Sequence, residues 1–139
     1  YEFVDAVAMR LVQWPNSYDV LITSNLFGDI LTDEASVISG SMGLMPSASV
    51  GSENALYEPI HGSYPEAAGK NIANPIASIL SLSMMLDHSF GLKIESQIIN
   101  NAVEQSLKNK YVTPDLSSDK KSYSTDQVGN YIVEFIEKS

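Results

Sequence analysis

Residues 25–36 read NLFGDILTDEAS and place two aspartates, Asp29 and Asp33, four positions apart in a mostly apolar run. The apolar spacing predicts a helix over residues 29–39, closed by Gly40 and Gly43. Side chains four positions apart in a helix lie on one face, one turn apart. The sequence therefore places two like charges where they repel each other.

No lysine or arginine occurs from residue 11 to residue 69, although the same window holds seven acidic residues. A cation for this acidic region must come from a metal ion, a partner chain or polypeptide outside this sequence. Two carboxylates one turn apart suit Mg²⁺, which takes a few carboxylates and keeps water in its other positions. We expect Asp29 in the first turn, where the helix dipole favours an anion. For an isolated pair of this spacing, a solvated helix face is the more common interpretation.

The composition sets limits on the class of protein. The chain has 139 residues and is 44% apolar, so it is long enough to bury a core. A net charge of −9 and a pI of about 4.4 argue against a nucleic acid or an anionic membrane as partner. The absence of cysteine excludes disulfides and thiolate metal sites, and it fits a reducing compartment, so we expect a cytoplasmic protein. No apolar run reaches the length of a membrane span.

The remaining sequence alternates short strand patterns with helical patterns. The run DVLIT, residues 19–23, predicts a buried strand. Asn74 followed by Pro75 predicts the start of a helix, and Ser124 with Gln127 forms a capping-box pattern. The other expected elements are a helix over residues 2–12, a strand over 44–51, and helices over 75–90, 94–108 and 124–136.

Residues 56–74 contain two prolines and two glycines and predict one long loop, which in a compact domain is usually functional. Backbone N–H groups near Gly62 and Gly69 can approach a phosphate, and Glu66 can accept hydrogen bonds from ribose hydroxyls. Neither a G-x-G-x-x-G nor a Walker motif is present, so spacing alone favours a structural loop. His88 lies near the expected end of a helix and indicates a capping or surface role.

Three segments resemble the isocitrate/isopropylmalate dehydrogenase family of metal-dependent β-decarboxylating dehydrogenases. They are VDAVAMRLV (residues 4–12), DVLITSNLFGDILTDEASVISGSMGLMPSAS (19–49) and YEPIHGSYPEAAGKNIANPIASILSLSMML (57–86). The last helix, with STDQVGNYI (124–132), is also similar to that family. The sequence FGDILTDEAS followed by GSMG resembles the isopropylmalate branch of this family more than its isocitrate branch.

The resemblance implies roles for particular residues. Asp29 and Asp33 match the family's ligands for Mg²⁺ or Mn²⁺, and Asp5 matches a metal ligand and substrate contact contributed to the other subunit of a homodimer. Tyr64 stands where many relatives have alanine, and Glu66 stands where aspartate is common. The segment that matches the NAD-binding loop consists of His61, Gly62, Ser63, Tyr64, Pro65, Glu66, Ala67, Ala68, Gly69, Lys70, Asn71, Ile72, Ala73 and Asn74.

The implied fold is α/β, and the chain is expected to be the C-terminal part of a larger subunit that contributes to both of its domains. Residues 1–40 would end the second, dimerisation and metal-binding domain, and residues 41–139 would form the C-terminal half of the first, NAD-binding domain. The family's catalytic lysine and tyrosine would lie upstream, so this chain supplies no catalytic residue and should be inactive alone.

The implied reaction is NAD-dependent, metal-assisted oxidative decarboxylation of 3-isopropylmalate to 2-oxo-4-methylpentanoate, in leucine biosynthesis. Related substrates are isocitrate, homoisocitrate and tartrate. The implied partners are a small-molecule substrate and a second copy of the subunit, without nucleic acid or membrane. A competing interpretation from a different class is a non-catalytic acidic interaction module.

Overall fold

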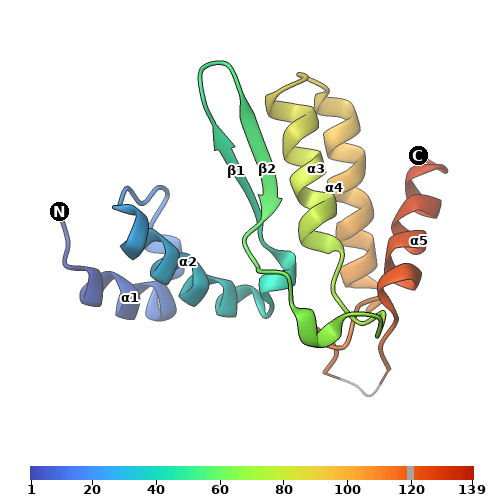
Figure 1. Ribbon diagram of the computed structural model, residues 1–139, viewed down its shortest axis with the longest axis horizontal. Helices are drawn as coiled ribbons and strands as arrows, with labels where there is room; N and C mark the ends of the chain where they lie inside the picture. The colour runs from blue at the N-terminus through green and yellow to red at the C-terminus, as the bar shows by residue number, and fades with distance from the viewer. Residues whose placement is uncertain (119–120) are drawn as a thin grey trace. The chain divides into compact units, whose positions relative to one another are not determined.

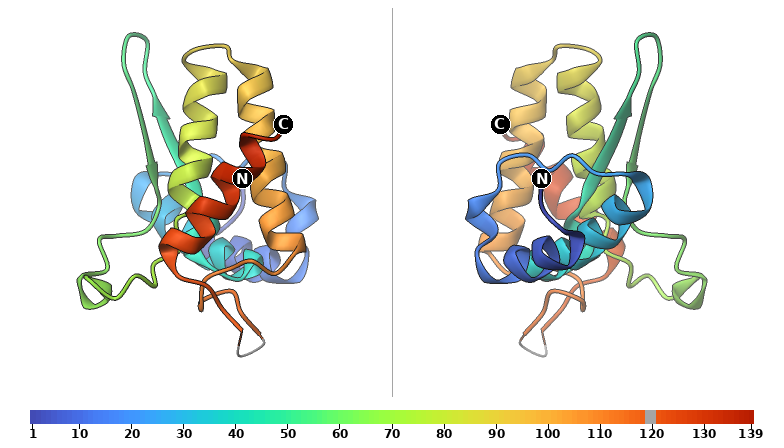
Figure 2. Two further views of the ribbon diagram at one scale, coloured as in Figure 1. Left: turned by 90° about the vertical axis from the view of Figure 1, so that its right-hand side faces the viewer. Right: turned by 90° about the vertical axis from the view of Figure 1, so that its left-hand side faces the viewer.

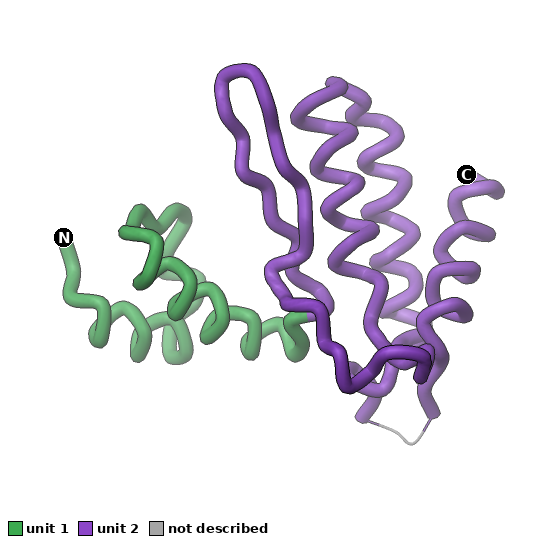
Figure 3. The backbone as a smooth tube through the Cα atoms, in the orientation of Figure 1, with its two compact units in different colours: residues 1–42 green, residues 43–139 purple. Residues whose placement is uncertain are grey.

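The computed structural model describes residues 1–118 and 121–139. The chain forms two compact units, residues 1–42 and residues 43–139 (Figure 3). This division lies close to the domain crossing expected at Gly40. The assignment of each unit to a domain of a larger subunit stays a prediction.

The first unit is a pair of packed helices. Helix α1, Val4–Gln13, is followed by a single 3₁₀ turn, η1, Pro15–Ser17, and by helix α2, Asn25–Ser39. Val7 and Leu11 of α1 meet Leu31 of α2, and these three side chains are buried because their helical spacing places them on the facing sides. Gly40 ends α2 with a φ of 97°, a left-handed conformation that glycine adopts without steric cost.

The second unit combines a hairpin with three helices. The short turn η2 (Met42–Leu44) begins at the division between the units. The elements that follow are β1 (Pro46–Val50), β2 (Ala55–Pro59), η3 (Pro65–Ala67), α3 (Ile76–His88), α4 (Lys93–Lys108) and α5 (Thr125–Ile136). The strands pair antiparallel, with Pro46 opposite Pro59 and Val50 opposite Ala55. Figures 1 and 2 show the hairpin beside α3, α4 against α3, and α5 on α4, as their contacts require.

The core of the second unit lies where α3, α4 and α5 meet. Ile76, Ala102, Val103, Val128 and Ile132 are its buried members, and each is at most 4% exposed. Val128 and Ile132 lie four positions apart on α5, and this helix begins with the predicted capping box, in which Ser124 and Gln127 exchange hydrogen bonds. The three predicted helices of this unit are therefore confirmed.

Three predictions about elements are wrong. Residues 19–23 form an irregular segment and not a buried strand, and Ile22 is 96% exposed, because no strand of the described chain pairs with this run. Residues 55–59 form strand β2, which the prediction of a single loop over 56–74 missed. Helix α2 begins at Asn25, four residues before the predicted start.

The helices also bear on membrane association. Within residues 1–118 and 121–139, none of them combines the length and the apolarity that crossing a bilayer demands.

Candidate functional site

Asp29 and Asp33 both lie on α2, and both side chains are exposed. The amide Nδ2 of Asn25 donates a hydrogen bond to Oδ2 of Asp29 over 3.0 Å. Because α2 starts at Asn25, Asp29 falls in the second turn, and the expectation that it occupies the first turn is wrong. The helix dipole, which acts mainly within the first turn, therefore does not offset the repulsion between the two carboxylates.

No ion pair within the described chain involves either aspartate. Arg10 is the only basic residue among residues 1–42, and its guanidinium is engaged with the carboxylate of Glu2. Tyr18 donates its hydroxyl to the same carboxylate over 2.7 Å. This hydrogen bond from Tyr18 and the charge of Arg10 both lower the pKa of Glu2. The same hydrogen bond raises the pKa of Tyr18, against the opposing effect of Arg10. The single basic side chain of residues 1–42 is therefore engaged elsewhere, and neither α2 carboxylate has an ion-pair partner among residues 1–118 and 121–139.

The donor set on α2 fits a hard divalent ion. Two carboxylates one turn apart, open to water and without a competing cation, are the ligands that Mg²⁺ and Mn²⁺ prefer. No group of three or more metal-ligating side chains forms within residues 1–118 and 121–139, so Asp5 does not join Asp29 and Asp33 inside this chain. Asp5 is exposed in the first turn of α1, where its Oδ1 accepts a hydrogen bond from the N–H of Ala6 over 2.8 Å. Its role toward a second subunit stays a prediction.

The second candidate region is the loop from His61 to Asn74 in the other unit. Its first half turns on itself, with hydrogen bonds from Ala67 N to Tyr64 O and from Lys70 N to Ala67 O, both 3.0 Å long. Ala67 is buried and holds the turn η3 against the unit, whereas Glu66 beside it is exposed. Nδ1 of His61 lies 3.0 Å from the carbonyl oxygen of Gly62. When Nδ1 carries the proton and donates to this oxygen, Nε2 is left as an acceptor.

The loop has the backbone features of a surface that a ligand approaches closely. A Cβ added at Gly62 or Gly69 would meet nothing within 4 Å, so both positions face open space. Gly69 has a φ of 74°, a conformation that side chains disfavour. Tyr64 adopts a φ of 44° and is 57% exposed. Strained, exposed backbone of this kind is common in ligand-binding loops, so the loop fits a dinucleotide through its backbone and Glu66.

The second half of the loop is held by residues that the sequence patterns did not indicate. Asn74 accepts a hydrogen bond from Ile76 N over 3.0 Å, although α3 begins at Ile76 with Pro75 as its N-cap, one residue later than predicted. Nδ2 of Asn74 donates to Asp115 over 3.0 Å. Asn71 is bonded to Asp126, 55 positions away in the sequence. No local signal could have found Asp115 or Asp126, because each partner becomes a neighbour only when the helices pack.

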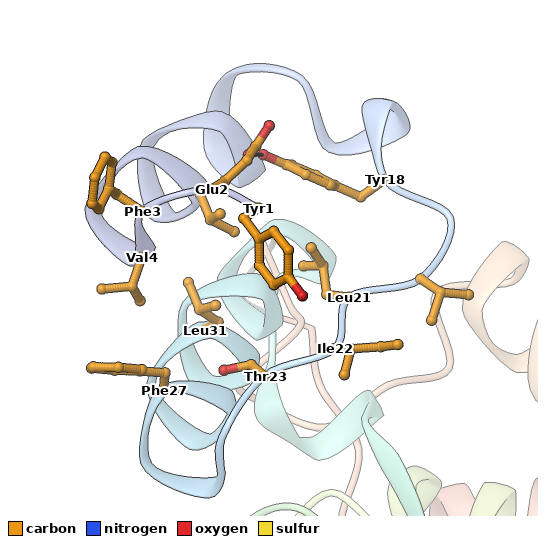
Figure 4. Close-up of a pocket in the computed structure, with 12 residues that line it drawn as sticks. Tyr1, Glu2, Phe3, Val4, Tyr18, Leu21, Ile22, Thr23, Phe27 and Leu31 are labelled. Atoms are coloured by element: carbon orange, nitrogen blue, oxygen red, sulfur yellow. Dashed lines mark hydrogen bonds between the residues drawn. The ribbon is translucent and has the colours of Figure 1, made fainter.

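A cavity of about 710 Å³ lies in the first unit (Figure 4). Apolar side chains dominate its lining, and Glu2 is its only carboxylate. Neither the α2 aspartates nor the loop lines it, and its one carboxylate, that of Glu2, is already bonded to Arg10 and Tyr18. It marks an apolar surface that residues 1–42 do not themselves fill. The lining residues are Tyr1, Glu2, Phe3, Val4, Val7, Tyr18, Val20, Leu21, Ile22, Thr23, Phe27 and Leu31.

The family model and the relatives found by comparison with known proteins agree with one another. The family model described as isocitrate/isopropylmalate dehydrogenase matches residues 1–132. The chain is 50% identical to 3-isopropylmalate dehydrogenase of Bacteroides fragilis over 140 residues, which is 100% of this chain and 39% of the relative. It is 51% identical to homoisocitrate dehydrogenase of Methanocaldococcus jannaschii, over 97% of this chain and 38% of the relative.

A solved structure agrees with these relatives. Isocitrate dehydrogenase from Methylococcus capsulatus superposes with a TM-score of 0.93 at 43% identity, covering 97% of this chain and 40% of that one. The chain thus spans about two fifths of the length of the proteins it matches. The predicted α/β fold of this dehydrogenase type is confirmed. On the family model, the sequence identity and the superposition together, this chain belongs to the isocitrate/isopropylmalate dehydrogenase family of oxidoreductases.

Proposed function

We propose that this chain supplies metal ligands and the dinucleotide loop of an NAD-dependent dehydrogenase that oxidises and decarboxylates 3-isopropylmalate. The observation that carries this proposal is the exposed pair Asp29 and Asp33 on α2, which no cation of the described chain neutralises. A pair of carboxylates that repel each other is maintained at little cost when a divalent ion binds between them.

When bound, a divalent ion supplies stabilisation of the negative charge that develops on a substrate oxygen, and NAD supplies a hydride acceptor. Asp29 and Asp33 would hold the ion, and α2 would orient both carboxylates because they project from one rigid face. The loop from His61 to Asn74 would bind the dinucleotide through its backbone. The chain's own contribution is therefore to position the two reactants.

The substrate assignment is supported by relatives named 3-isopropylmalate dehydrogenase, such as those of Bacteroides fragilis and Thermotoga maritima, the latter 52% identical. Homoisocitrate, isocitrate and tartrate are the competing substrates of the proposal. The test is a substrate panel on the complete gene product that carries this sequence, with NAD and Mg²⁺ or Mn²⁺. A higher kcat/KM for any of the three competitors than for 3-isopropylmalate contradicts this assignment.

Glu66 gives a prediction about cofactor choice. Its exposed carboxylate sits in the turn η3 and should accept hydrogen bonds from the adenosine ribose, while repelling a 2′-phosphate. We expect the complete gene product to prefer NAD over NADP. Replacing Glu66 by lysine should reduce that preference by at least about tenfold, because one repulsive charge becomes attractive.

The measurement is kcat/KM for NAD and NADP with the wild-type protein and Glu66→Lys. Glu58→Lys is a matched control, because it makes the same charge change on strand β2 outside the loop. A wild-type preference for NADP, or an equal shift in both variants, contradicts the role given to Glu66.

Asp5 gives a prediction about assembly. We propose a homodimer in which Asp5 completes the metal and substrate site of the second subunit. The Asp5→Asn and Asp29→Asn homodimers should each be dimeric, folded and nearly inactive. Mixed dimers should regain about one intact site per dimer, because one site then carries both changes and the other carries none. Purified mixed dimers that stay inactive would show that Asp5 does not act across the interface.

A further inference from the structure

The loop of residues 61–74 is hydrogen-bonded to the beginning of helix α5. Thr125 N donates to the carbonyl oxygen of Asn71 over 3.1 Å, and the hydroxyl of Thr125 donates to the carbonyl oxygen of Ala73 over 2.6 Å. The side chain of Asn71 makes two further hydrogen bonds, one with the carboxylate and one with the backbone N–H of Asp126. Figure 1 shows this part of the chain, between η3 and α3, running past the first turn of α5.

The contact between Asn71 and Asp126 is reciprocal. Nδ2 of Asn71 donates to Oδ2 of Asp126 over 2.9 Å, and the N–H of Asp126 donates to Oδ1 of Asn71 over 3.2 Å. Both ends of one carboxamide are therefore engaged by one residue, which fixes the rotation of the Asn71 side chain as well as its position. The first of these bonds has a charged acceptor and is stronger than a neutral one.

This contact acts where the loop backbone needs support. Asn71 has a φ of 54°, a conformation that asparagine tolerates better than most residues but that still carries strain. Gly69, two positions earlier, is also left-handed, with a φ of 74°. The turn from Tyr64 to Lys70 is closed mainly by its own backbone hydrogen bonds. The bonds to α5, together with the buried side chain of Ala67, therefore hold that turn, with Glu66, on the unit.

We propose that Asp126 is a positioning residue for the dinucleotide, acting through Asn71 to hold the loop of residues 61–74 in its binding conformation. The inference rests on the proposed function, because it assigns the loop to NAD. Asp126 itself touches the loop and not the cofactor. Without the contact, the loop samples other conformations. The apparent affinity for the dinucleotide then falls in proportion to the fraction of molecules that remain competent to bind it.

The test uses the complete gene product and titrates NAD in the absence of substrate, by calorimetry or protein fluorescence. Asp126→Ala removes the acceptor, and Asn71→Gly removes the carboxamide while permitting the left-handed backbone. Each should raise the dissociation constant for NAD by about tenfold, the change that corresponds to one charge-assisted hydrogen bond. The double variant should bind no more weakly than either single one, because the two residues act as a unit.

Two further variants separate positioning from general destabilisation. Asp126→Asn keeps an acceptor oxygen and should restore the affinity to within about threefold of wild type. Glu95→Ala removes an exposed carboxylate from the first turn of α4, which is the same change at another helix start, and should leave NAD binding unaltered. At saturating NAD, the kcat of Asp126→Ala should be within about twofold of wild type, because the lost energy concerns binding alone.

Each result of these experiments either supports or contradicts the role given to Asp126. If wild type binds NAD and Asp126→Ala binds equally well, the inference is wrong while the proposed function stands. Additive losses in the double variant also overturn it. If Asp126→Ala does not fold, Asn71→Gly decides, and wild-type affinity in that variant overturns the inference. If the wild-type protein fails to bind NAD at all, the proposed function itself fails.

Discussion

Asp29→Asn is expected to lower the affinity for Mg²⁺ or Mn²⁺ and the turnover of the complete gene product together, each by at least about 100-fold. The substitution keeps the size of the side chain but removes one of two adjacent negative charges, and an amide oxygen is a much weaker ligand for a hard cation. The same change relieves the repulsion with Asp33. Without metal, the variant should therefore be as stable as wild type or slightly more stable, by up to about 0.5 kcal/mol.

Thermal unfolding with and without Mg²⁺ checks this expectation. A ligand that binds only the folded state raises the unfolding temperature, so Mg²⁺ should stabilise wild type and have little effect on Asp29→Asn. Glu34→Gln is the matched control, because it removes one negative charge from the same helix on a different face. Equal metal affinity in wild type and Asp29→Asn, or equal losses in Asp29→Asn and Glu34→Gln, would contradict the assignment of the metal site.

Gly43→Ala is expected to destabilise the fold by about 2–4 kcal/mol, the sum of an overpacking cost and a lost helix cap. A Cβ at this position would lie 2.6 Å from Cβ and 2.9 Å from Cγ of Asn74. Asn74 has little freedom to move, because its carboxamide caps Ile76 N and donates to Asp115. Ile76 in turn is fully buried in the core, so the displacement spreads into the start of α3.

Chemical denaturation of the complete gene product measures this effect. Gly129→Ala serves as the control, since Gly129 lies inside α5 and a Cβ there would meet nothing within 4 Å. That substitution should stabilise the protein by about 0.5–1 kcal/mol, because alanine loses less conformational entropy than glycine in a helix. The two substitutions are therefore expected to change the free energy of unfolding in opposite directions. A Gly43→Ala variant as stable as wild type would show that the side chain of Asn74 can move away without loss of stability.

Local patterns were sufficient for much of the second unit. The capping box at Ser124, the hydrogen bond from Ile76 N to Asn74 and the apolar spacing of α3, α4 and α5 each act within a few residues, so the sequence contains the whole signal. The exposed acidic face of α2 was predictable for the same reason, because helical spacing alone places Asp29 and Asp33 one turn apart. Resemblance to the family added the prediction that the loop of residues 61–74 binds NAD, which spacing alone did not indicate.

The start of α2 and the strand β2 show where local patterns were insufficient. Ser24, a residue type common at N-caps, is the N-cap of α2, but its side chain makes no cap hydrogen bond, and the prediction assigned residues 24–28 to a loop, so the predicted start fell four residues late. The run of residues 55–59 has prolines and glycines just beyond it and resembles a loop, but it becomes a strand because β1 offers a partner. The run of residues 19–23 has a strand composition yet finds no such partner in the described chain.

The sequence by itself therefore determined that the helices form, the capping box at Ser124 and the spacing of the paired carboxylates, because hydrogen bonds and side-chain contacts within three or four positions decide these features. The tertiary structure alone decided which segments pair as strands, why Gly43 must lack a side chain beside Asn74, and how Asp126 reaches the loop at Asn71. Asn71 and Asp126 are 55 positions apart, and only the packing of α5 on α4 and α3 brings them within hydrogen-bonding distance. Contacts of this kind depend on burial shared among several elements, and no short stretch of sequence encodes them.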